Sequence, residues 1–213
     1  MSKITLTGFK AEYFITNKKL KFLRPIIEQW LKINREYIEY CNYSDSLYSY
    51  NERSTISTLA GAVWRCGGYA QEEYIAEKGT EKRNGRIDLF FHFSNKDVVI
   101  EAKQKFIWLA PNSRKNLHEH IKVSLDDSVK DAKQTKQANA MYYGDIYLAI
   151  TFIVPYWHKD SNQNEKLKII KQFSKSKDID TDFSVIFESE EDIDHNDEGD
   201  VSNIVIMLCK VVN

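Results

Sequence analysis

A chain of 213 residues with 42% hydrophobic and 29% charged residues has the composition of a folded globular protein, which excludes an intrinsically disordered one. No run of about 18 apolar residues occurs, and the N-terminus lacks the apolar core of a signal peptide, so we expect no membrane-spanning segment. The net charge of −1 excludes a chain that is basic overall, although residues 103–136 are rich in lysine and residues 188–200 are acidic. Such a local basic face can still bind phosphate, or it can be a solvated helix surface.

The length fits one domain, and no linker or internal repeat divides the chain, so we expect a single domain over residues 1–213. Cys41, Cys66 and Cys209 are too few and too scattered for a disulfide framework or a zinc site. We therefore expect reduced, packed thiols in a cytoplasmic protein.

Two helices are predicted before the first strand. The first covers about residues 23–42, where Pro25 suits the first turn and a broad apolar face follows. The second covers about residues 52–66, with Asn51 as a plausible N-cap, and the glycine pair beginning at Gly67 ends it. Both helices present an apolar stripe that we expect to pack against a sheet.

Three strands are predicted next, at about Tyr69–Glu77, Ile87–Phe93 and Val98–Trp108. The short segment SNKD, with Asn95–Lys96 in the turn, separates the last two strands. We therefore expect these two strands to pair as an antiparallel hairpin.

The remaining elements alternate between helix and strand. A helix is predicted over about Leu117–Ala140, followed by a strand at 145–154 that Pro155 halts. A weaker helix and two strands on either side of an acidic loop complete the chain, at 162–174, Phe183–Phe187 and Ile204–Val212. The order of elements predicts an α/β (α+β) domain with a central mixed β-sheet flanked by helices.

Charged residues lie at the ends of the two hairpin strands, beside apolar runs. Asp88 stands in GRIDLFF, and Glu101 and Lys103 directly follow the run VVI. Side chains two apart on a strand share a face, so Glu101 and Lys103 project together and Ala102 turns the other way. Asp88 and Glu101 are expected to meet at the open end of the hairpin, where two carboxylates repel unless a cation lies between them. Mg²⁺ prefers such carboxylate and carbonyl oxygens.

At these residues the chain resembles the PD-(D/E)XK, or restriction-endonuclease-like, nuclease superfamily. The resemblance consists of Asp88, then Glu101-Ala102-Lys103, with the hairpin between them and helices before and after in the family's order. Ile87 stands where the motif has its proline, which many members lack. The resemblance covers about residues 50–155 and implies a restriction-endonuclease-like core. The helix at about 23–42 and an extension at about 160–213 would be elaborations on that core.

The resemblance implies a metal-dependent nuclease that hydrolyses phosphodiester bonds, with DNA as the expected substrate. Asp88, Glu101 and the carbonyl of Ala102 are the implied ligands of Mg²⁺, with Mn²⁺ as the expected substitute, and Lys103 is implied to position the attacking water. Proteins of this size with this motif are often restriction or other host-defence nucleases. A homodimer would fit that role, since cutting both strands of a duplex needs two sites.

Two further residues are candidates for the site. Family members commonly carry an acid on the helix before the sheet, which is Glu52 here, although its place in a first helical turn is also explained by the helix dipole. Glu72 and Glu73 are the rival acids if residues 69–77 form a strand. Gln134, on the helix after the hairpin, could reach a scissile phosphate or be an ordinary exposed helix residue.

The same charged residues are also compatible with two interpretations in which the protein is not an enzyme. Asp88 could pair with Arg86, and Lys103 could neutralise Glu101 as a surface ion pair of small energetic value. The protein would then be a non-catalytic nucleic-acid- or protein-binding module on the same fold, with the acidic segment 188–200 contacting a protein partner or covering the basic face. An unrelated α/β domain with a structural ion cluster is the third alternative, and it requires Lys103 to pair with Glu101.

Overall fold

The computed structural model describes residues 2–6, 8–78, 83–109, 117–139, 144–161, 164–176, 178–194 and 199–212. The strands are β1 (Ser2–Leu6), β2 (Phe9–Ile15), β3 (Tyr69–Lys78), β4 (Arg83–Phe93), β5 (Lys96–Trp108), β6 (Ile146–His158), β7 (Phe183–Asp194) and β8 (Asp200–Val211). The α-helices are α1 (Arg24–Tyr40), α2 (Glu52–Arg65), α3 (Leu117–Asn139) and α4 (Asn164–Phe173), and two short 3₁₀ helices cover Lys18–Leu23 and Leu47–Ser49. Within the described residues, no helix is both long enough and apolar enough to cross a membrane.

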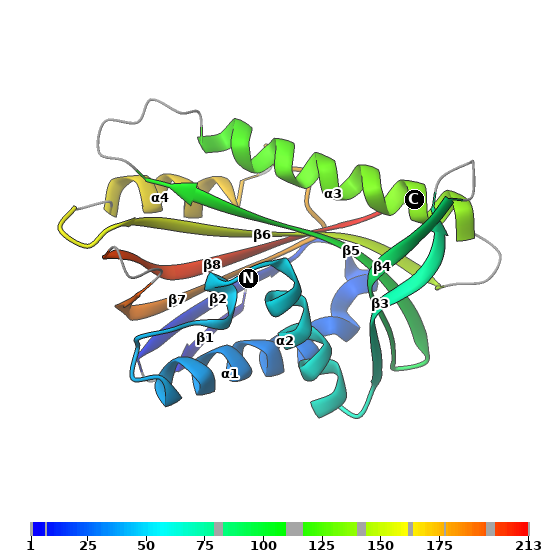
Figure 1. Ribbon diagram of the computed structural model, residues 1–213, viewed down its shortest axis with the longest axis horizontal. Helices are drawn as coiled ribbons and strands as arrows, with labels where there is room; N and C mark the ends of the chain where they lie inside the picture. Colours follow the sequence, from blue (N-terminus) through cyan, green and yellow to red (C-terminus); the bar gives the residue numbers. More distant parts are fainter. Residues whose placement is uncertain are drawn as a thin grey trace.

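The described strands form one eight-stranded sheet in the order β1-β2-β7-β8-β6-β5-β4-β3. The β5–β6 pair is parallel, and the other pairs are antiparallel. Helices α1 and α2 cover one face of the sheet, and α3 and α4 cover the other (Figure 1). The predicted class, a mixed sheet flanked by helices, is therefore confirmed.

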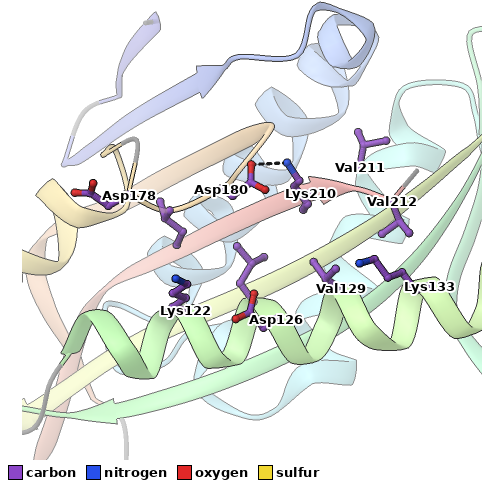
Figure 2. Close-up of a pocket in the computed structure, with 11 residues that line it drawn as sticks. Lys122, Asp126, Val129, Lys133, Asp178, Asp180, Lys210, Val211 and Val212 are labelled. Atoms are coloured by element: carbon purple, nitrogen blue, oxygen red, sulfur yellow. Dashed lines mark hydrogen bonds and ion pairs between the residues drawn. The ribbon is translucent and has the colours of Figure 1, made fainter.

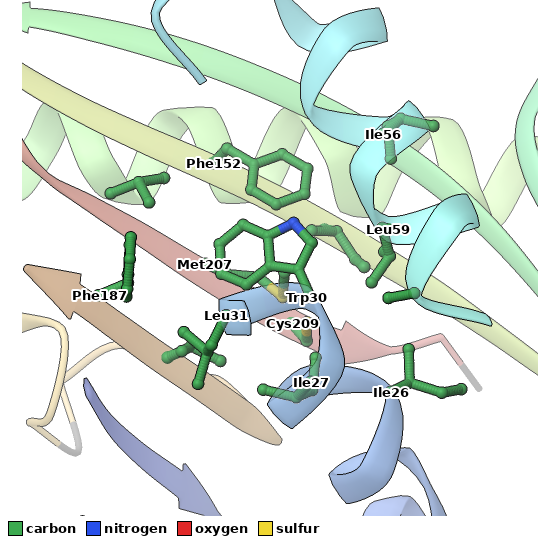
Figure 3. Close-up of a cluster of buried hydrophobic side chains, with 14 of the residues drawn as sticks. Ile26, Ile27, Trp30, Leu31, Ile56, Leu59, Phe152, Phe187, Met207 and Cys209 are labelled. Atoms are coloured by element: carbon green, nitrogen blue, oxygen red, sulfur yellow. The ribbon is translucent and has the colours of Figure 1, made fainter. Parts of the chain in front are cut away.

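The two N-terminal helices form as predicted because each buries one apolar stripe. Trp30 of α1 is fully buried and lies among side chains of both helices and the central strands (Figure 3). Its indole Nε1 donates to the hydroxyl of Thr58 on α2 at 2.8 Å, which satisfies the buried N–H and joins the helices. Asn51 caps α2 as expected, since its side chain accepts a hydrogen bond from the Ser54 amide at 3.0 Å.

The predicted hairpin is present as β4 and β5, in the antiparallel arrangement expected. The last pair of the ladder joins Phe93 to Lys96, so the turn consists of Ser94 and Asn95, one residue earlier than predicted. Both turn residues have a positive φ, 54° and 56°, as a tight two-residue turn between twisted strands requires.

Strands β1 and β2 were not predicted from the sequence. Along β2 the buried residues Phe9, Ala11 and Tyr13 alternate with more exposed ones, which is the pattern of a strand with one face on a core. The strand pairs with β7 from Phe9 to Ile15, so the sheet extends beyond the elements expected.

The prediction that Pro155 halts its strand is wrong. Strand β6 continues through Pro155 to His158, and Pro155 lies opposite Ile107 in the parallel ladder with β5. On the other side of β6, the register with β8 shifts between Ile153 and Trp157. A proline is tolerated at such an irregularity, where its missing N–H breaks no ladder hydrogen bond.

The prediction of an acidic loop over residues 188–200 is also wrong for most of that segment. Strand β7 continues to Asp194 and β8 begins at Asp200, while 195–198 lie outside the described residues. Two of the acids pair with lysines, Glu188 with Lys171 at 2.7 Å and Glu190 with Lys10 at 3.3 Å. Strand β8 pairs with both β6 and β7, so the C-terminal segment forms an interior part of the sheet.

Candidate functional site

Strands β4 and β5, toward the β3 edge of the sheet, are paired only next to their turn. Their ladder ends at the pair Leu89–Ile100, whereas β5 continues beside β6 as far as Trp108. Past this point, two carboxylates accept hydrogen bonds from backbone amides of β5. The Ala102 amide donates to Asp88 Oδ2 at 2.7 Å, and the Gln104 amide donates to Glu52 Oε2 at 3.0 Å. We call the residues around this opening the edge site: Glu52, Asp88, Glu101, Ala102 and Lys103.

Asp88 reaches β5 because β4 changes face at this residue. Leu89 packs in the core beneath α1 and α2, whereas Ile87 packs in the cluster that contains Ala132 of α3. Residues two apart on a regular strand share a face, so the backbone direction is interrupted at Asp88. The neighbours of Asp88 on β4 pair with β3 in one continuous register, Leu89 with Glu72 and Ile87 with Tyr74. Asp88 itself and the residue opposite it, Glu73, form no ladder pair.

Glu101 and Lys103 share a face, as predicted, and both contact side chains of α3. The Thr135 hydroxyl donates to Glu101 Oε1 at 2.6 Å, and Lys103 Nζ lies 2.7 Å from Asp131 Oδ2. Glu101 and Lys103, which are two positions apart on β5, therefore contact Thr135 and Asp131, which are four positions apart on α3. Glu101 is almost fully buried, with 1% of its surface exposed, so its carboxylate depends on such partners.

Ala102 turns to the opposite face and packs in the core beneath α1 and α2. Its amide points toward the opening, where it meets Asp88. In a strand, the N–H and C=O groups of one residue face the same neighbour. The carbonyl of Ala102 therefore faces the opening too, and this carbonyl is the backbone ligand that the resemblance implied.

Gln104 fixes the first turn of α2 against β5. Its side-chain oxygen accepts from the Thr55 hydroxyl at 2.6 Å, and its side-chain nitrogen donates to the Tyr48 carbonyl at 2.8 Å. With the bond from its amide to Glu52, two hydrogen bonds hold the first turn of α2 at the opening, and the third holds the 3₁₀ helix that precedes it. Glu52 therefore lies at the edge site because its helix is attached there.

The charges of the edge site shift the pKa values of two of its members. Burial raises the pKa of Glu52, and the nearby carboxylate of Asp88 raises it further, against the opposing effects of Lys103 and the Gln104 amide. For Lys103, burial lowers the pKa, but the hydrogen bond and charge of Asp131 outweigh it, so the pKa is raised. Lys103 is consequently an ammonium group at neutral pH.

The structure places the other candidates differently. Gln134 is exposed on α3, whereas Asp131 and Thr135 of the same helix contact Lys103 and Glu101. Glu72 accepts a hydrogen bond from Ser57 of α2. Glu73 pairs with two arginines, and neither Glu72 nor Glu73 takes the position held by Glu52.

Four residues of this region were missed in the sequence: Asp131, Thr135, Gln104 and Thr55. Asp131 and Thr135 could have been found from their spacing. Residues four apart on a helix share a face, so they can contact two residues that are two apart on a strand. Gln104 directly follows the motif, and its role depends on the position of α2, which the sequence does not reveal. Lys103 forms an ion pair with Asp131. The alternative of an unrelated domain with a structural ion cluster required Lys103 to pair with Glu101 instead.

The donor atoms of the edge site suit a hard divalent cation. The carboxylates of Asp131, Glu52 and Asp88 act on the ammonium of Lys103, and the pKa of Glu52 is raised by burial and then by the charge of Asp88. Among the described residues, no group of three or more Asp, Glu, His or Cys side chains is arranged to hold a metal ion. A metal would therefore rest on two carboxylates and the Ala102 carbonyl, all of them oxygen donors.

A pocket of about 420 Å³ lies on the same side of the sheet as α3, between that helix, the segment before β7 and the end of β8 (Figure 2). Its charged lining consists of Lys122, Asp126, Lys133, Asp178, Asp180 and Lys210. The opposite charges partly neutralise one another, as Lys210 Nζ and Asp180 Oδ1 do at 2.5 Å. The pocket shares no residue with the edge site.

Comparison with known proteins adds no relative: no family model, no curated protein and no solved structure matches this chain.

Proposed function

We propose that the protein is a metal-dependent nuclease that hydrolyses phosphodiester bonds, with DNA as its substrate. The observation that carries this proposal is the opening between β4 and β5: Asp88 bonds the Ala102 amide there, and Glu101 and Lys103 on either side of Ala102 both contact α3, in the order of the PD-(D/E)XK motif. Carboxylates beside a buried sheet are costly unless they are paired or used. A site for a divalent cation and a phosphate accounts for their concentration here.

Each residue of the edge site is assigned one role in this proposal. Asp88, Glu101 and the Ala102 carbonyl would hold Mg²⁺, which when bound supplies positive charge to the phosphate and acidifies water. Lys103 is held by Asp131 as an ammonium group, so it donates hydrogen bonds and stabilises negative charge on the phosphate oxygens. Glu52, whose pKa is raised, is suited to accept a proton.

Cleavage of supercoiled plasmid DNA with Mg²⁺ or Mn²⁺ tests the proposal. Asp88→Asn and Lys103→Met should each slow cleavage by at least about 100-fold, the usual scale for losing one electrostatic catalytic group. Asp126→Asn is the matched control, because Asp126 is an exposed acid of α3 outside the edge site. Cleavage by Asp88→Asn at the wild-type rate would contradict the proposal.

One observation favours a second candidate, a non-catalytic binding module on the same fold. The charged groups of the edge site have structural partners: Asp88 and Glu52 cap amides of β5, and Lys103 pairs with Asp131. In that case these acids only satisfy the backbone amides of β5 that have no partner strand. The wild-type protein would then cleave neither DNA nor RNA with either metal, and Asp88→Asn would change stability alone.

A further inference from the structure

Two arginines lie directly beside the acids of the edge site. Arg53 follows Glu52 in the first turn of α2, and Arg86 precedes Asp88 by two residues on β4. Both side chains are largely exposed, at 74% for Arg53 and 61% for Arg86. The same helix turn and the same strand therefore present an acid to the opening and a guanidinium group to solvent.

Glu73 holds both arginines with one carboxylate. Its Oε1 lies 3.1 Å from Arg53 Nε, and its Oε2 lies 3.1 Å from Arg86 Nη1. One negative charge cannot neutralise two guanidinium groups, so this trio carries a net positive charge. It projects from the surface next to an otherwise acidic site.

The backbone at Glu73 is strained, and the strain belongs to the interruption that directs Asp88. Glu73 has a φ of 52°, in a region that side chains other than glycine rarely adopt within a strand. On β3, as on β4, the side-chain direction changes at this point: Glu72 bonds Ser57 of α2, while Tyr74 packs toward the α3 side. Such strain persists where the surrounding structure fixes it, and it is concentrated at functional sites.

We propose that Arg53 and Arg86 form a binding site for a backbone phosphate of nucleic acid, adjacent to the scissile phosphate. Guanidinium groups bind phosphate oxygens through paired hydrogen bonds, and an exposed pair of them offers more donors than one carboxylate can occupy. Glu73 orients the two arginines before the substrate arrives and competes with its phosphate. This inference rests on the proposed nuclease function for the identity of the substrate.

The test is binding of a short fluorescein-labelled duplex DNA, followed by fluorescence anisotropy in EDTA over a range of salt concentrations, so that no cleavage occurs. Arg53→Gln and Arg86→Gln should each weaken binding and reduce the slope of log K against log salt by up to about 0.9, the value for one phosphate contact that is lost entirely. Glu73→Gln should tighten binding several-fold, because it removes the competing charge.

Arg65→Gln is the matched control, since Arg65 lies on the same helix and pairs with Glu36 at 2.7 Å, far along α2 from the edge site. It should bind DNA as the wild type does. Arg53→Lys and Arg86→Lys retain the charge, so they should restore the salt slope, which depends on the number of phosphates neutralised.

The outcomes separate this inference from the proposed function. Arginine variants that bind DNA like Arg65→Gln, or a wild-type protein that binds no DNA, would overturn the phosphate site. Loss of binding in the arginine variants of a protein that does not cleave DNA would support the phosphate site and contradict the nuclease.

Discussion

The sheet has two regions that differ in how their strands are held. In the region of β2, β7, β8 and β6, long ladders resume after register shifts in the β6–β8 and β7–β8 pairs, and both faces are covered with apolar side chains, including those around Trp30 (Figure 3). In the region of β3, β4 and β5, one ladder ends early and another is interrupted at a single pair of positions. Carboxylate side chains there accept the backbone hydrogen bonds that a neighbouring strand would otherwise accept.

The difference shows how a sheet can hold charged side chains at an opening between two strands while its backbone hydrogen bonds stay satisfied. A missing ladder would leave buried amides unsatisfied, at about 1–3 kcal/mol each. Asp88 and Glu52 satisfy two of these amides and at the same time bring negative charge to the opening. The first region contributes stability, and the second holds charged groups in fixed positions.

The largest effect on stability is expected in the first region. Trp30→Ala removes a fully buried indole and the hydrogen bond to Thr58, and it should lower the free energy of unfolding by about 3–5 kcal/mol. Chemical denaturation measures this change. Trp64→Ala is the control, because Trp64 is 54% exposed and its main aromatic contact is an edge-on one with Tyr69, so its loss should cost only about 0.5–1.5 kcal/mol. Equal losses in both variants would remove the distinction between core and surface on which the comparison rests.

A smaller loss is expected where α3 supports the opening. Thr135→Val removes the hydroxyl that donates to the buried Glu101, and it should destabilise the protein by about 1–3 kcal/mol. Thr135→Ser keeps the donor and should retain most of the stability. If the valine variant is as stable as the serine variant in denaturant titrations, Thr135 does not support the carboxylate.

The ion pair on α3 should affect reactivity more than stability. Asp131→Asn removes the partner of the partly exposed Lys103, which should cost about 0.2–1 kcal/mol of stability. It should also lower the pKa of Lys103, because Asp131 provides the main opposition to burial. The alkaline limb of the pH–cleavage profile should therefore move to lower pH. An unchanged profile would show that the charge of Lys103 is not needed.

The smallest effect concerns the pH dependence of stability at Glu52. Its pKa in the folded protein is raised by burial and by Asp88, so the folded state binds the proton more tightly than the unfolded state does. Stability from this residue is therefore present at low pH and is lost as the pH rises above the unfolded value of about 4.3 toward the folded one. The difference in stability between the wild type and Glu52→Gln, measured by denaturation from acid to neutral pH, should therefore shift against the wild type as the pH rises.

Much of the second region could be predicted from the sequence because its signals are local. The hairpin, the shared face of Glu101 and Lys103, and the capped helix that begins at Glu52 each follow from periodicity and turn chemistry. The choice of Asp131 and Thr135 as their partners depends on the angle at which α3 crosses β5, which no local pattern specifies.

The errors have a common physical origin in long-range pairing. Strands β1 and β2 find their place only because β7 offers an edge, and the acidic part of β7 is a strand because β2 and β8 flank it. The sequence around Pro155 predicts the end of a strand because the irregularity that accommodates this proline lies in the ladder between β6 and β8, which the local sequence does not show. The interruption at Glu73 and Asp88 is likewise a property of two paired strands, which neither strand shows alone.

The most direct test of the central claim is calorimetric titration of Mn²⁺ and Mg²⁺ into the wild type, Asp88→Asn and Asp126→Asn. If the opening between β4 and β5 holds a divalent cation, the wild type and Asp126→Asn should bind metal with the same affinity, and Asp88→Asn should not. Metal binding that is equal in all three proteins, or absent from the wild type, would contradict the claim that these acids form a metal site.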